Sequence, residues 1–251
     1  MPHARTTESL NRLTAIAATL FDTPAATVVL MGEDGMKLSG GVNVCRDEAP
    51  RKSSFTEAAV AMGADAVLVV ENAAKDPRFK DSEVVAGPNH VRFYAGAVIT
   101  CKDGRRAGAI CVLDIFPRER PGDDKLEALK NLAQMAADIL DRDAEFRRQK
   151  DQLAMIDLAE TMSGVGHWRL DLVSGGVTWS DEVFRIHRKT RGEFTPTLEA
   201  VIDFYHPDDR PVIHAQVEHM RATGEPTQSE SRLIVADGTE RLIQTNTAPE
   251  F

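Results

Sequence analysis

The sequence is poor in cysteine and has no cysteine pair with the spacing of a metal site. Its three cysteines are Cys45, Cys101 and Cys111, and none belongs to a Cys-x-x-Cys motif. An odd number of cysteines without ligand spacing argues against both a disulfide framework and a zinc ribbon. We therefore expect reduced thiols, most of them buried.

Long apolar segments are absent as well. The longest apolar runs, such as residues 66–70, fall far short of the ~20 residues that a membrane-crossing helix requires. The N-terminus also lacks the apolar stretch of a secretory signal. These absences predict a cytoplasmic protein without membrane insertion.

Basic side chains are outnumbered by acidic ones, with 30 Lys and Arg against 39 Asp and Glu, so the net charge is −9. A nucleic-acid-binding surface needs concentrated positive charge, and we therefore expect no nucleic-acid partner. Aromatic residues make up only 6%, but 42% hydrophobic and 27% charged residues are typical of globular proteins. A length of 251 residues fits two domains of ordinary size.

The apolar pattern over residues 1–121 predicts a domain that mixes helices and strands. An amphipathic helix is predicted over residues 7–20, because apolar residues recur there at spacings of three and four: Leu10, Leu13, Ile16, Ala17 and Leu20. Residues 72–90 show no periodicity and form a long loop, which in a compact domain is often functional. The other expected elements are a hairpin of residues 26–31 and 36–44, a helix from Ser53 or Ser54 to about Met62, a strand at residues 67–70, and a hairpin of residues 93–101 and 107–113.

Residues 122–161 are the predicted linker. From residue 123 to 161 there is neither proline nor glycine, which predicts one long helix. Along this helix, mainly apolar residues recur from Met135 to Ile156 at alternating steps of four and three, which is the pattern of a heptad seam. Two positions of the seam are polar, Arg142 and Gln149. The alternative is a long helix packed on its own domain; we favour a parallel coiled coil between two copies of the chain. The expected interface residues are Met135, Ile139, Arg142, Phe146, Gln149, Leu153 and Ile156.

The pattern of residues 162–251 predicts a second α+β domain. The two halves of the chain share no sequence repeat. Asp237-Gly238 is a strong hairpin signal between two alternating segments. The expected fold class is thus α+β, with two domains that each contain a central antiparallel sheet flanked by helices. The expected elements are strands at residues 167–172 and 177–179, helical segments at 181–186, 198–204 and 208–222, and a hairpin of residues 231–235 and 241–245.

Three motifs in the first half carry a family resemblance. They are Asp76-Pro77-Arg78-Phe79, the segment over residues 91–96, and the segment over residues 108–114 with Pro117-Arg118. In this order and spacing they resemble the GAF domains of bacterial sensor kinases and cyclases. The resemblance covers nearly all of residues 7–140 and implies a sensory domain.

The second half resembles a PAS domain, on residues 166–171, 177–182, His206-Pro207-Asp208-Asp209-Arg210 and Asp237-Gly238-Thr239. We expect Asp208 or Asp209 to cap the helix that follows, a scaffold role. The PAS pattern continues after residue 239 with two long strands, whereas this chain has one. The resemblance therefore implies a last strand that is missing or supplied from elsewhere, and an N-terminal fragment of a longer sensor.

The motifs of cofactor-dependent and catalytic relatives are absent. There is no Cys-His pair for a bilin, no complete flavin-linking motif around Cys45, no cyclic-GMP signature, no phosphoacceptor histidine and no Gly-rich nucleotide loop. His206, His214 and His219 lack the spacing of a metal-binding pair. We expect no cofactor, no metal site and no catalytic activity.

The expected function is a sensory module that passes a ligand or interface signal through a dimeric linker helix to an output domain outside this chain. Two alternatives stay open: a ligand-free dimerisation module, and a free methionine sulfoxide reductase that uses Cys101 and Cys111. For an unknown small-molecule ligand, the candidates in the first domain are Phe55, Thr56, Phe79, Phe93 and Tyr94. Those in the second are Trp168, Trp179, Phe204 and Tyr205. Core packing is the alternative role for each.

Overall fold

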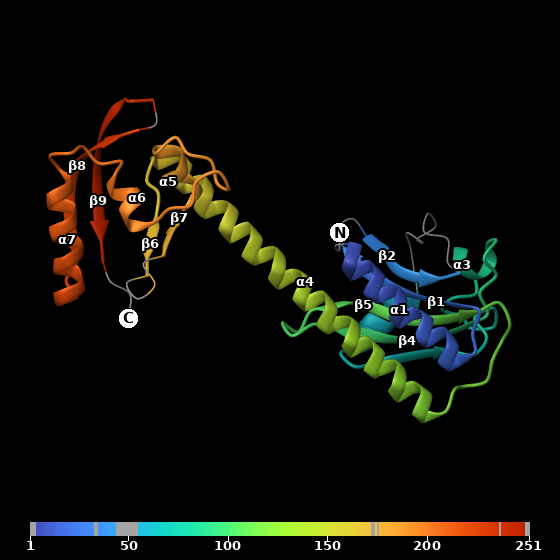
Figure 1. Cartoon of the computed structure of the whole chain (residues 1–251). Helices are drawn as coiled ribbons and strands as arrows, with labels where there is room; N and C mark the ends of the chain where they lie inside the picture. Colours follow the sequence, from blue (N-terminus) through green and yellow to red (C-terminus); the bar gives the residue numbers. More distant parts are fainter. Residues whose placement is uncertain are drawn as a thin grey trace. The chain divides into compact units, whose positions relative to one another are not determined.

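The computed structural model describes residues 4–32, 35–43, 55–171, 174, 176–235 and 237–248. The chain divides into two compact units, residues 1–149 and 150–251, and the division falls within the long helix α4, Asp123–Ser163 (Figure 1). Cys45 and the expected helix caps Ser53 and Ser54 lie outside the described residues.

Unit 1 is built on one antiparallel sheet of five strands in the order β2-β1-β5-β4-β3. Both predicted hairpins and the predicted single strand are confirmed. The strands are β1 Ala25–Gly32, β2 Gly35–Val42, β3 Val67–Val70, β4 Phe93–Thr100 and β5 Arg106–Asp114.

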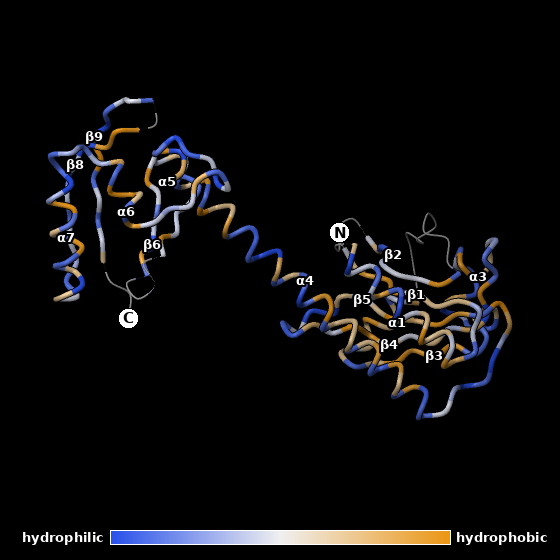
Figure 2. Tube along the Cα trace, viewed as in Figure 1, coloured by the Kyte–Doolittle hydropathy of each residue, from blue (hydrophilic) through white to orange (hydrophobic). Residues whose placement is uncertain are grey.

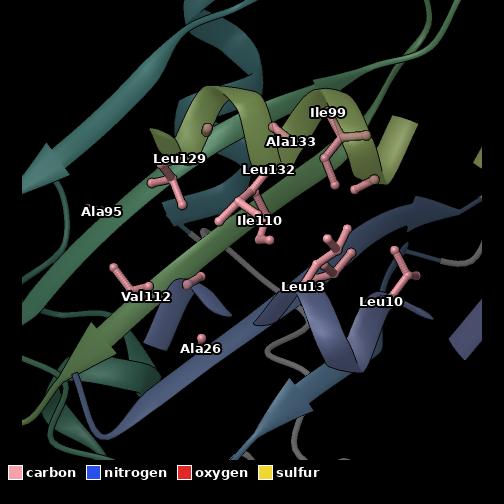
Figure 3. Packing of buried hydrophobic residues seen from close by; sticks show 14 of the residues in the cluster. Leu10, Leu13, Ala26, Ala95, Ile99, Ile110, Val112, Leu129, Leu132 and Ala133 are labelled. Carbon is pink, nitrogen blue, oxygen red and sulfur yellow. The ribbon is translucent and has the colours of Figure 1, made fainter. Parts of the chain in front are cut away.

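One face of this sheet is covered by α1, Ala4–Phe21, and by the first part of α4. Figure 3 shows Leu10 and Leu13 of α1 and Leu129 of α4 in one cluster; Ile99 of β4 and Ile110 of β5 belong to the same cluster. The spacing of three and four on both helices presents an apolar stripe to the sheet. For α1 the predicted stripe is confirmed at Leu10, Leu13 and Ala17, whereas Ile16 and Leu20 are exposed and do not belong to it. We call the residues buried here the helix-side core.

The opposite face is covered by α2, Phe55–Met62, and by the segment between β3 and β4. As predicted, residues 72–90 are mainly loop, but they also contain the one-turn helix α3, Glu83–Ala86, whose Val85 is buried. A single turn is too short to produce helical periodicity in the sequence. We call the residues buried on this face the loop-side core.

Asp114 and Arg118, both in the motifs that resemble GAF domains, act as scaffold in unit 1. The buried Asp114 carboxylate accepts a 2.7 Å hydrogen bond from Arg118 Nε. Arg118 also donates to the carbonyl oxygens of Phe21 and Asp22, at 3.2 and 2.6 Å. The pair therefore fastens the end of α1 to the end of β5.

Unit 2 contains two separate two-stranded antiparallel sheets, β6 with β7 and β8 with β9. The predicted elements are present, with end shifts of a few residues. Apolar and polar colours alternate along α7 in Figure 2, and its Ile213, Val217 and Met220 are buried. The elements are β6 Trp168–Leu170, β7 Val177–Trp179, α5 Asp181–Ile186, α6 Leu198–Ile202, α7 Arg210–Thr223, β8 Thr227–Ile234 and β9 Glu240–Thr247.

The prediction that a carboxylate caps the free backbone N–H groups at the start of α7 is wrong. Asp209 occupies the N-cap position, but its side chain makes no cap hydrogen bond. Its carboxylate instead accepts from the backbone N and from both Nε and Nη2 of Arg232 on β8, at 2.8, 3.0 and 2.6 Å. A charged guanidinium is a stronger donor than a backbone amide. Asp209 thus remains a scaffold residue, by joining α7 to β8.

Candidate functional site

Four of the five candidate residues in unit 1 meet in the loop-side core. The ring of Phe55 lies 4.6 Å from the rings of Phe79 and Tyr94, measured between centroids, and Thr56 is also buried. The Asp76 carboxylate accepts a hydrogen bond from the backbone N–H of Arg78, and this bond closes a turn directly before Phe79. In the described residues this region is therefore a packed aromatic cluster.

The Tyr94 hydroxyl is a polar group buried within this cluster. It is buried and has no hydrogen-bond partner of ordinary geometry among the described residues, although Thr56 and Cys111 approach it. Burial raises the pKa of Tyr94 well above its ordinary value, so the group is neutral. The ring lies over Gly96, where a Cβ atom would be only 2.2 Å from the hydroxyl oxygen.

Phe93 does not belong with the other candidates. It is 1% exposed and lies in the helix-side core, on the opposite face of the sheet from Tyr94. Neighbouring side chains of a strand point to opposite faces, so two adjacent aromatic residues cannot line one pocket.

The two described thiols are separated by the same sheet. Cys111 lies in the loop-side core and Cys101 in the helix-side core. Desolvation raises the pKa of Cys111 to about 12 and that of Cys101 to about 11. Both groups are therefore protonated thiols at neutral pH and weak nucleophiles.

Unit 2 contains a hollow of about 640 Å³. Three of the four candidate residues line it: Trp168 and Trp179, which are paired directly across β6 and β7, and Tyr205. Phe204 is absent from the lining and packs behind it, with its ring 6.3 Å from that of Trp179.

His187, which the sequence reasoning did not single out, also lines the hollow. Its ring stacks on Trp179 at 4.3 Å and is 6% exposed. Nδ1 donates to the carbonyl oxygen of Val183 at 2.8 Å, and Nε2 has no partner among the described residues. Desolvation lowers the pKa of His187, so the ring is neutral and Nε2 is an unused acceptor. The sequence around His187 contains no motif that predicts this position, because the residues around its ring are brought together only by the fold.

The second half of α4 presents most of the predicted seam to solvent. Leu153 is 68% exposed and Ile156 is 52% exposed. Ile139 differs, because it is half-buried against the helix-side core. The alternative of a helix packed on its own domain therefore holds for the first part of α4. Met135, Arg142, Phe146 and Gln149 are exposed.

Contacts within unit 2 fasten the end of α4 to α5. Arg185 of α5 donates to the Thr161 hydroxyl at 2.6 Å and to the Asp157 carboxylate at 3.2 Å. Glu160 pairs with His167, just before β6. Because Val183 and Ile186 of the same α5 line the hollow, one short helix contacts both the hollow and α4.

Among the described residues, no three or more His, Cys, Asp or Glu side chains lie close enough together to hold a metal ion. None of their helices has the length and apolar character needed to span a bilayer.

Each of the two units is a small α+β domain. The sequence profile of the GAF domain matches residues 5–140, and that of the PAS fold matches residues 176–250. The first match covers more than half of the chain. The chain therefore belongs to the GAF domain family, and a PAS domain follows its GAF domain.

Two curated relatives are similar to parts of the chain. A cyclic di-GMP phosphodiesterase of Pseudomonas aeruginosa is 30% identical over 128 residues, 51% of this chain and 22% of that protein. A blue-light-activated histidine kinase of Brucella ovis is 32% identical over 101 residues, 40% of this chain and 20% of that protein. The chain thus spans about a fifth of the length of these relatives.

Solved structures resemble the fold at low identity. The GAF domain of an Acinetobacter phosphoenolpyruvate-protein phosphotransferase is 12% identical with a TM-score of 0.46, over 57% of this chain and 86% of that one. The GAF domain of Thermosynechococcus elongatus PixJ in its blue-light-absorbing form is 11% identical with a TM-score of 0.45, over 60% of this chain and 94% of that one.

Proposed function

We propose that the chain is a non-catalytic sensory module that signals through a homodimeric α4 to an output domain outside this sequence. The observation that carries the proposal is the exposed apolar seam at Leu153 and Ile156, on a helix that is built into both units. Pairing two copies would remove this apolar surface from water. The GAF and PAS family matches support a sensory role.

The contacts of α5 supply a physical route for the signal. A ligand that binds two arrangements of the hollow unequally shifts their populations. A shift of α5 would then move Arg185 and change its bonds to Asp157 and Thr161 on α4. The arrangement of the two α4 helices in the dimer would then change, and with it the state of the signalling protein.

The catalytic alternative has weak support. A reductase that uses two cysteines needs thiolates that can reach one substrate, whereas Cys101 and Cys111 are buried, on opposite sides of the sheet and with raised pKa values. The ligand-free dimerisation module differs from our proposal only in lacking a ligand, so a binding measurement separates the two.

The test of the dimer compares two double variants of α4 by light scattering at tens of micromolar. Replacing Leu153 and Ile156 with aspartate should convert the dimer to a monomer. The matched control replaces Met155 and Leu158 with aspartate; these are also exposed but lie on the opposite face of the helix, and the dimer should persist. Ile139 is unsuitable for this test because it also packs in unit 1.

A wild-type monomer, or equal effects of the two double variants, would remove α4 as the principal interface. The proposed signalling route would then fail.

A further inference from the structure

The lining of the hollow in unit 2 is unusual for so acidic a protein. The chain carries 39 Asp and Glu residues, yet among the described residues no Asp, Glu or Lys lines the hollow. The one described side chain there with a permanent charge is Arg241 on β9. The electrostatic potential in the hollow is therefore set by one cation.

Arg241 also differs from the other arginines of this unit in its partners. It is half-buried, its one hydrogen bond is a long one of 3.5 Å from Nη1 to the carbonyl oxygen of Ile186, and no described carboxylate lies within ion-pair distance of it. A half-buried guanidinium without a counter-charge gains substantially from a bound anion. Six other described arginines of unit 2 do have a carboxylate within ion-pair distance, for example Arg185, Arg210 and Arg232; the remaining three of the six are Arg188, Arg191 and Arg221.

The rest of the lining is suited to a flat apolar body with a polar edge. The half-buried Trp168 supplies an aromatic face, and rings prefer to stack against such a face. The stacked rings of Trp179 and His187 line the same hollow. The His187 ring is neutral, and its unpartnered Nε2 would gain a hydrogen bond from a ligand N–H or O–H group. Arg241 lies near His187, because its bond partner Ile186 is the neighbouring residue.

We propose that this hollow binds a small aromatic carboxylate whose ring carries an N–H or O–H donor, with the carboxylate paired to Arg241 and the donor directed to Nε2 of His187. The inference rests on the proposed sensory function and specifies its ligand class. Arg241 is the residue that selects the anion, and His187 selects the ring donor.

The test uses the full 251-residue chain and three probes of nearly equal size: 4-hydroxybenzoate, 4-hydroxybenzamide without the charge, and benzoate without the ring donor. Both tryptophans of the protein line the hollow, so their fluorescence reports binding directly, and calorimetry gives the affinity. We expect 4-hydroxybenzoate to bind with a Kd below about 1 mM, and both other probes to bind at least about tenfold more weakly.

The variants assign each preference to its residue. Arg241→Gln should lower the affinity for 4-hydroxybenzoate about tenfold or more and leave the affinity for 4-hydroxybenzamide unchanged. The affinity of Arg241→Lys for 4-hydroxybenzoate should lie between those of wild type and Arg241→Gln. His187→Phe should abolish the preference for 4-hydroxybenzoate over benzoate. The control is Arg221→Gln, which removes the same charge from a residue outside the hollow and should leave all affinities unchanged.

Absence of fluorescence change and heat with all three probes at 10 mM, a value about tenfold above the expected limit, would overturn the ligand class. Equal affinity for the acid and the amide, or equal effects of Arg241→Gln and Arg221→Gln, would overturn the role of Arg241. If a variant fails to fold, the comparison of the probes on the wild-type chain still decides. None of these results affects the light-scattering test of α4, so the failure of this inference can be told from failure of the sensory proposal.

Discussion

The packing around Tyr94 shows how single residues constrain unit 1. A tyrosine ring with a buried hydroxyl fits the loop-side core only because residue 96 of the same strand has no side chain. Residues two apart on a strand share a face, so Gly96 lies beneath the ring. The two residues are therefore energetically coupled.

We predict that Gly96→Ala destabilises unit 1 by about 1–3 kcal/mol, the usual cost of forcing an extra methyl group into a packed core. The measurement is the free energy of unfolding in urea. In a Tyr94→Val background the same substitution should cost much less, because the clashing ring is gone. Equal costs in both backgrounds would show that the ring does not rest on Gly96.

The pair of Asp209 and Arg232 predicts a dependence of stability on pH. The guanidinium lowers the pKa of Asp209 to about 2, below the ordinary value of 3.8. A carboxyl group whose pKa is lower in the folded state than in the unfolded state stabilises the fold at pH values above its unfolded-state pKa. This contribution is lost as the pH falls toward the folded-state pKa.

We therefore expect wild type to exceed Asp209→Asn in unfolding free energy at pH 6, and the difference to shrink between about pH 4 and pH 2. Urea titrations at several pH values measure it. An Asp208→Asn variant is the control, because Asp208 is 75% exposed and lies farther from Arg232. A difference that does not change with pH would contradict the assignment.

At the scale of elements, α4 is one helix with two environments. Its first part packs in the helix-side core, and contacts with unit 1 continue to Asp143, which accepts a 2.8 Å hydrogen bond from Thr6 of α1. Beyond that point its apolar residues are mainly exposed. The first part thus stabilises unit 1, whereas we assign the later part to the interface between copies.

We predict opposite consequences for two leucines of this helix. Leu129→Ala should destabilise unit 1 by about 2–5 kcal/mol, because Leu129 is 0% exposed in the helix-side core. Leu153→Ala should leave the unfolding of unit 1 unchanged and weaken the dimer. Urea unfolding and light scattering on the same samples separate the effects. A stable Leu129→Ala variant would mean that the first part of α4 contributes little to unit 1.

At the scale of the whole molecule, the proposal assigns catalysis to a different part of the signalling protein. We predict that the purified chain neither autophosphorylates with ATP nor turns over GTP or cyclic di-GMP. We also predict that it reduces no free methionine sulfoxide, because both described thiols are protonated at neutral pH. Radiolabelled nucleotide assays and a coupled reductase assay test this, and turnover by the pure protein in any of them would refute the non-catalytic assignment.

The sequence by itself determined the elements and their order. The strands β3 and β7 and the helix α5 have the predicted bounds, because apolar spacing and local turn signals act over a few residues. The motifs that resemble GAF and PAS domains also identified both families, since they depend on residue types in fixed order. The extent of α4 followed from the absence of proline and glycine.

Only the tertiary structure decided which side chains meet. Phe93 and Tyr94 looked equivalent in the sequence, but the orientation of the sheet sends them to opposite cores. Ile139 fits a heptad seam, yet unit 1 partly covers it. Arg241 and His187 are distant in the chain and border one hollow because β9 folds back against α5. Local spacing carries no information about such pairings, since contacts between distant residues form only when the whole domain packs.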